Sequence, residues 1–144
     1  MLFRTESAGS SRPRVVWCDI GKTPRAAVIP QGSDAVPLNT CYVARCRDDT
    51  DAYTLTALLN SGPIAAWLSL LAEPARGGYL RFLGWTMSLL PVPKDWMRAR
   101  RILGPVGSAA NAGVPPDPDQ LTRAVLDAYR LSCGEVDALL KWNG

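Results

Sequence analysis

The chain has 144 residues, which is enough for one domain with a modest core and a small appendage. Its composition, 47% apolar and 20% charged, is ordinary for a globular protein, and a net charge of +3 is too small to indicate a partner by itself. The longest apolar run, 64–72, is interrupted by Ser69 and is far shorter than the ~20 residues that a bilayer requires, and the N-terminus has no signal-peptide core. We therefore expect no membrane segment and a cytoplasmic location.

The distribution of charge is more informative than its sum. Residues 1–47 and 71–105 are rich in Lys and Arg, whereas 48–70 carry only acids and 106–144 carry more acids than bases. A surface with separate basic patches fits a polyanionic partner, although such patches are more often only solvated faces.

Taken in chain order, the first half predicts three strands. Residues 1–13 are rich in Ser, Gly and Arg and are expected to form a flexible leader. Residues 14–20 and 25–29 are strands by their β-branched content, and the Gly-Lys-Thr-Pro turn between them predicts a hairpin. A loop then leads into a third strand over 38–46.

Two helices and an extended segment are predicted next. The acidic run at 48–51 supplies capping oxygens for a helix near 52–60. Pro63 suits the first turn of a second helix near 63–72, which is apolar on nearly all sides and is therefore expected to pack against the sheet. Residues 82–90 are expected to form a further strand or extended segment, closed by the alternate prolines of Leu90-Pro91-Val92-Pro93.

The sequence after these elements is rich in Gly, Ala and Pro. The stretch GPVGSAANAGVPP predicts a linker, and a helical hairpin follows it, with a Ser132–Glu135 capping box opening the second helix. We predict an α+β fold with a small mixed sheet packed with two helices, followed by a C-terminal helical hairpin. The expected divisions are a leader (1–13), an α/β domain (14–97), a linker (98–116) and the hairpin (117–144).

Catalytic and metal sites are difficult to assemble from this sequence. There is no histidine, no Cys-x-x-Cys and no phosphate-binding glycine loop. Helix capping explains the carboxylates at 48–51, and the four cysteines are expected to be reduced and mostly buried. We assign no catalytic residue and no metal ligand, so the residues describe a binding protein rather than a catalyst.

The stretch ARGGYLRF, residues 75–82, carries the clearest binding chemistry. Arginine binds phosphate or guanine through two parallel hydrogen bonds, glycine lets the backbone approach a phosphate, and aromatic rings stack on bases. On these residues alone, a structural turn with Tyr79 and Phe82 in the core is favoured over a nucleic-acid contact.

The order of the segments along the chain gives more weight to a nucleic-acid contact. The chain resembles the C-terminal target recognition domain of N6-adenine DNA methyltransferases of type IIG and related restriction-modification systems. The resemblance covers about residues 14–93 and rests on RVVWCDIGKTPRAAVI, VPLNTCYVARC, LTALLNSGPIAAWL, ARGGYLRF and LLPVP, in that order. The terminal LTRAVLDAYRLSCGEVDALL is similar to the helical tail that often follows the domain.

The resemblance implies binding of double-stranded DNA, with the double glycine forming a turn that presents arginines and with Phe82 in the core. The expected DNA-binding residues are Lys22, Arg25, Arg76, Gly77, Gly78, Tyr79 and Arg81. In that family a separate domain binds S-adenosylmethionine and carries an Asn/Asp-Pro-Pro-Tyr/Phe motif. The only double proline here, in Val114-Pro115-Pro116-Asp117, lacks both flanking residues of that motif.

Catalysis and the cofactor are therefore expected on another domain or chain, and no cofactor is expected in this one. The expected partners are DNA and a methyltransferase catalytic domain or subunit. Two alternatives stay open at this point. The chain could be a non-catalytic protein-interaction subunit, or a degenerate remnant, of such a methyltransferase, or it could be an enzyme with an unfamiliar site.

Overall fold

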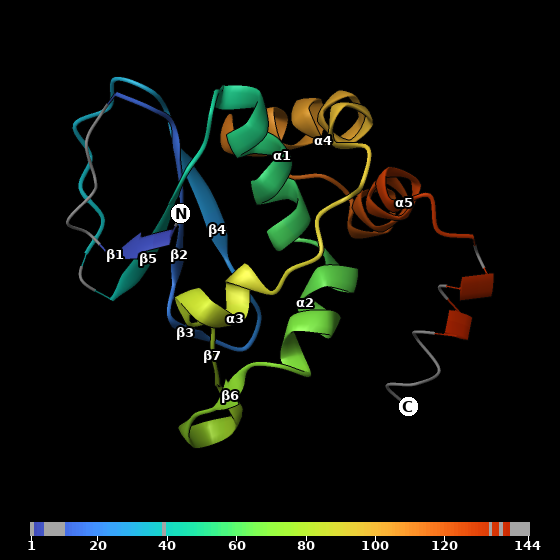
Figure 1. Ribbon diagram of the computed structural model, residues 1–144, viewed down its shortest axis with the longest axis horizontal. Coiled ribbons are helices and arrows are strands. Elements are labelled where there is room, and N and C mark those ends of the chain that lie inside the picture. Colours follow the sequence, from blue (N-terminus) through green and yellow to red (C-terminus); the bar gives the residue numbers. More distant parts are fainter. Residues whose placement is uncertain (1, 5–10, 39, 133, 136, 139–144) are drawn as a thin grey trace.

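Two antiparallel sheets and a set of helices make up the computed structural model (Figure 1). It describes residues 2–4, 11–38, 40–132, 134, 135, 137 and 138. The predicted α+β class is confirmed. No helix in this described part combines the length and apolar character needed to cross a membrane.

The larger sheet has the strand order β1-β5-β2-β4. Its strands are β1 (Leu2–Arg4), β5 (Cys41–Arg45), β2 (Arg14–Cys18) and β4 (Ala26–Ile29). Val15 lies opposite both Val28 and Ala44, and these three side chains are buried in one core cluster. The strands predicted over 14–20, 25–29 and 38–46 are thus confirmed, with shorter bounds.

The fourth strand of this sheet differs from the prediction. The expected flexible leader is wrong for Leu2–Arg4, because this segment pairs with β5 along the sheet edge. The strand expected over 82–90 is also wrong: α3 (Gly84–Ser88) occupies most of it. Phe82, Thr86 and Leu90 recur every fourth residue, a helical spacing, and Phe82 and Thr86 are buried.

The two predicted helices are present as α1 (Asp49–Leu59) and α2 (Gly62–Ser69). The Asp48 side chain caps α1 by accepting a hydrogen bond from the Asp51 N–H at 2.8 Å, as expected of the acidic run. Packing of α2 against the sheet was a wrong expectation, because α2 packs mainly on α1 and on the later helix α5 (Pro118–Tyr129).

The linker predicted over 98–116 is also wrong, because most of it is helical. Residues 96–111 form α4 (Trp96–Asn111), the longest of the described helices, which continues through the exposed Pro105. Two of the glycines that suggest a flexible linker, Gly104 and Gly107, lie on the face that meets α1. A Cβ atom at Gly107 would lie 2.1 Å from the Tyr53 carbonyl oxygen, and one at Gly104 would lie 3.0 Å from Thr50 Cγ2. Only glycine lets the two helices approach this closely.

Helix α5 is not part of a separate unit. Leu121, Val125 and Ala128 of α5 belong to the same core cluster as the strand residues. The second helix of the predicted hairpin lies largely outside the described residues, but its capping box is confirmed. Glu135 Oε2 accepts hydrogen bonds from the Ser132 N–H and Oγ–H, both at 2.8 Å.

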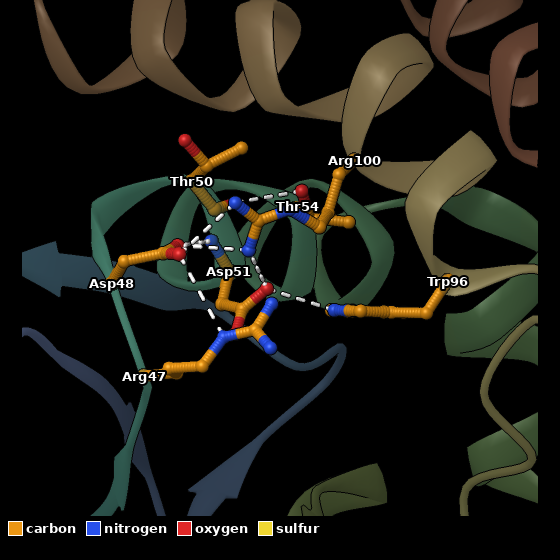
Figure 2. A network of polar contacts seen from close by, with 7 residues as sticks. All are labelled: Arg47, Asp48, Thr50, Asp51, Thr54, Trp96 and Arg100. Atoms are coloured by element: carbon orange, nitrogen blue, oxygen red, sulfur yellow. Dashed lines mark hydrogen bonds and ion pairs between the residues drawn. The ribbon is translucent and has the colours of Figure 1, made fainter.

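A polar network fastens α4 to the start of α1 (Figure 2). The Arg100 guanidinium donates to both carboxylate oxygens of Asp48, at 2.9 and 3.0 Å, and also to Asp51. The Trp96 indole N–H donates to Asp51 at 2.8 Å, and Arg47 lies 3.4 Å from the same carboxylate. The acidic run thus does more than cap a helix, because it also holds α4 in place.

Replacing Gly107 with Ala tests the close helix approach. The new methyl group meets the Tyr53 backbone, so the overpacking cost of about 1–3 kcal/mol should outweigh the gain of about 1 kcal/mol in helix propensity. We expect a clear fall in the free energy of unfolding, measured by urea denaturation. The matched control is Gly62→Ala, whose methyl group makes only an ordinary 3.8 Å contact with Thr122 and should change stability by less than about 0.5 kcal/mol. Equal stability of the two variants would refute the close approach.

The Arg100 contacts also predict a dependence of stability on pH. Hydrogen bonding from Arg100, and then from the Asp51 N–H, holds the pKa of Asp48 below its ordinary value. Because the folded state has the lower pKa, this stabilisation is present above about pH 4 and is lost as the pH falls through the folded value. In Arg100→Gln the melting temperature should therefore decline less steeply from about pH 5 to pH 2.5 than in the wild type. Arg123→Gln, an exposed change on α5, should leave the wild-type slope intact.

Candidate nucleic-acid interface

A glycine hairpin projects from the lower end of the molecule in Figure 1. Its strands are β6 (Glu73–Pro74) and β7 (Leu80–Arg81), joined by the 3₁₀ turn η2 (Arg76–Gly78). The Ala75 N–H donates to the Tyr79 carbonyl at 2.7 Å and closes the loop. Gly77 and Gly78 have φ of +72° and +75°, in the left-handed region that favours glycine. The prediction of a turn at the double glycine is confirmed.

Strand pairing attaches this hairpin to the start of the chain. β3 (Ile20–Gly21) pairs with β7, so that Gly21 lies opposite Leu80. The Phe82 N–H donates to the Asp19 carbonyl at 2.7 Å, and the Trp17 indole N–H donates to the Phe82 carbonyl at 2.9 Å. Phe82 is 1% exposed, as expected of a core residue. The hairpin is therefore held against the main sheet by backbone bonds and a buried aromatic ring.

This pairing brings two cationic side chains beside an aromatic one. The Lys22 Nζ lies 5.9 Å from the centroid of the Tyr79 ring, within the range of a cation–π contact. Both residues, with Arg25, border a cavity of about 290 Å³ between the two parts of the chain. The described residues that line it are Cys18, Ile20, Gly21, Lys22, Thr23, Arg25 and Tyr79.

The side chain of Asn60 helps to place Arg25. Asn60 follows α1 and binds both peptide groups of Ala26 on the edge strand β4. Ala26 N–H donates to Asn60 Oδ1 at 2.8 Å, and Asn60 Nδ2 donates to the Ala26 carbonyl at 2.9 Å. With Pro24 buried on the other side, the backbone of Arg25 is held on both flanks while its side chain stays exposed. The cation is therefore presented from a fixed backbone.

The two hairpin arginines lie outside the cavity lining. Arg76 and Arg81 are both exposed, one in the turn and the other on β7. Leu80 packs on the core, so the alternation of strand side chains points Arg81 toward solvent. Glu73 lies directly opposite Arg81 on β6 and reduces the positive potential at that position. The seven predicted residues thus lie either in the glycine hairpin or in the loop between β3 and β4, but only Lys22, Arg25 and Tyr79 line the same cavity.

Several residues of the site were not identified from the sequence. Cys18, Ile20 and Thr23 line the cavity, and Asn60 positions Arg25 from a helix end. The cavity follows from the pairing of β3 with β7, and the role of Asn60 follows from the contact of the end of α1 with β4. Both join segments that are far apart in the sequence, so no local pattern indicates them. Among the described residues, no group of three or more His, Cys, Asp or Glu side chains could hold a metal ion.

Comparison with known proteins adds no relative. No protein-family model matches the chain, and no curated protein matches it either.

The left-handed turn predicts a graded response to substitution at Gly78. Nothing lies within 4 Å of a Cβ atom placed there, so any cost comes from the backbone conformation alone. We expect Gly78→Ala to lower the free energy of unfolding by about 1–2 kcal/mol, Gly78→Asn by less, and Gly78→Val by more. Urea denaturation measures the series, with Arg76→Ala, an exposed change in the same turn, expected within about 0.5 kcal/mol of the wild type. A valine variant as stable as the wild type would contradict the expectation.

Proposed function

We propose that the chain is the DNA-binding target recognition module of an N6-adenine DNA methyltransferase or restriction-modification enzyme. The observation that supports this proposal most is the convergence of exposed cations on one projecting hairpin and the cavity beside it. Lys22 and Arg25 come from one end of the chain and Arg76 and Arg81 from its middle, and strand pairing brings them together.

The shape of the hairpin suits a groove of DNA. The major groove accepts a two-stranded β-ribbon, and here the ribbon carries an arginine at its tip and another on a strand. Arginine can bind phosphate, or guanine through O6 and N7, with two parallel hydrogen bonds. The cations at the cavity are in turn suited to a phosphate of the backbone, which fixes the position of the protein without reading sequence.

Under this proposal the chain supplies specificity, and S-adenosylmethionine and the catalytic motif belong to another domain or chain. The partner is accordingly a methyltransferase catalytic domain or subunit as well as DNA. A second candidate function is a non-catalytic protein-interaction subunit. It is favoured by Trp85, Leu89 and Val92, which each expose about half of their surface on and after α3.

DNA binding by alanine variants tests the proposal. Fluorescence anisotropy on a labelled duplex of mixed sequence should show salt-dependent binding by the wild type. Lys22→Ala and Arg25→Ala should weaken it about equally for all sequences and lower the salt slope by about 1 each, as expected for lost phosphate contacts. Arg76→Ala or Arg81→Ala should cost about 1–3 kcal/mol, and only on a preferred site selected from a randomised duplex pool, if it contacts a base.

Arg123→Ala removes the same charge from α5, which lies away from the hairpin at the right of Figure 1. It should leave affinity nearly unchanged, and the melting temperatures of all variants serve as the folding control. Equal affinities for the control and the four site variants would reject the proposed interface. Absence of any salt-dependent binding would favour the protein-interaction function instead.

A further inference from the structure

Two cysteines face each other at the end of the main sheet, beside the cavity. Cys18 ends β2 and Cys41 begins β5, and the strand register places them directly opposite one another. Their Sγ atoms are 3.9 Å apart. They are therefore neighbours in space although 23 positions separate them in the sequence.

The hydrogen bonds on either side define the type of strand pair. The Asp19 N–H donates to the Thr40 carbonyl at 3.1 Å, and the Cys46 N–H donates to the Pro13 carbonyl at 2.9 Å. Hydrogen-bonded and non-hydrogen-bonded pairs alternate along an antiparallel ladder, so Cys18 and Cys41 form a non-hydrogen-bonded pair. The side chains approach most closely in such pairs, whose Cα atoms are typically about 4.5 Å apart, a separation that a disulfide can span.

The pair is also accessible, contrary to the expectation of mostly buried thiols. Cys18 is exposed and Cys41 is half-buried, whereas Cys46 fits the expectation and is buried. Burial, and then the nearby Asp51, raises the pKa of the Cys46 thiol to about 12, so this cysteine is poorly reactive. Burial and the contact with Cys18 raise the pKa of Cys41 as well. Cys18 is the more exposed thiol of the pair and is therefore the one that a peroxide in solution reaches first.

We propose that Cys18 and Cys41 are a redox-active dithiol that closes to a reversible intramolecular disulfide when it reacts with hydrogen peroxide. The reaction has two steps. Cys18 Sγ attacks the peroxide, forming an S–O bond and breaking the O–O bond, so that a sulfenic acid forms and water leaves. Cys41 Sγ then attacks Cys18 Sγ, forming the S–S bond and breaking the S–O bond, and the hydroxyl group leaves with the Cys41 proton as a second water.

The two thiols together lose two electrons and two protons, and the peroxide becomes two water molecules. A dithiol reductant reverses the bond by exchange. The proposed disulfide does not depend on the proposed DNA binding. Cys18 nevertheless lines the same cavity as Lys22 and Arg25. Closing the bond would thus change one wall of that cavity.

Peptide mapping after peroxide treatment tests the proposal on the full chain. Trypsin should release Cys18 in peptide 15–22 and Cys41 in peptide 26–45, apart from Cys46 in 46–47 and Cys133 in 131–141. We expect a linked species of 15–22 with 26–45, two hydrogen atoms lighter than the sum of the free peptides. The thiol count under denaturing conditions should fall from four to two, and dithiothreitol should restore all four.

Two cysteine variants make the result specific. Cys133→Ser should keep the linked peptide, because Cys133 takes no part in the bond. Cys41→Ser should lose it, and Cys18 should then accumulate sulfinic acid or link two chains. Four intact thiols after peroxide would overturn the proposal. Wild-type protein in which Cys18 is only over-oxidised, or in which Cys133 or a second chain is the main disulfide partner, would overturn it equally.

Discussion

Helix α1 has to be covered on more than one side, and most of the fold follows from that requirement. Ala52, Thr54, Leu58 and Leu59 are all at most 2% exposed, although they point in different directions around the helix. The sheet covers one side through β2 and β4, and α4 covers another. A helix of this kind cannot be stable at a surface, because its apolar side chains would remain in water. The chain after residue 95 therefore has to return across α1, and Gly107 allows it to do so at backbone contact.

Each end of α1 makes hydrogen bonds that hold another element in place. At the first end, Asp48 and Asp51 receive Arg100 and Trp96 from α4, so the capping residues also align the covering helix. At the C-terminal end, the Asn60 side chain makes the two hydrogen bonds with Ala26 that a neighbouring strand would otherwise make at the edge of the sheet. Core packing and the proposed interface are thus mechanically connected, because the loop that carries the interface cations is anchored to the same helix that organises the core.

The proposed interface and the cysteine pair meet where the two sheets join. The chain leaves the larger sheet at Cys18 and enters the smaller one at Ile20, and Asp19 between them bonds to Thr40 and to Phe82 through its backbone. A bond between Cys18 and Cys41 would close the larger sheet at this junction. Cations, an aromatic ring and a thiol pair therefore gather at one corner of the fold, although they come from segments that are far apart in the sequence.

The sequence by itself determined the elements whose signals are local. β-branched runs predicted β2, β4 and β5, the acidic run and Pro63 predicted the starts of α1 and α2, and the double glycine predicted a turn. Tertiary structure alone decided the rest. Whether GPVGSAAN forms a linker or a helix depends on whether α1 lies within reach, since the same glycines are breakers in water and contact points against another helix. Likewise, Lys22 meets Tyr79 and Cys18 meets Cys41 only through strand pairing. Such pairing is set by long-range burial of apolar surface, which no window of the sequence contains.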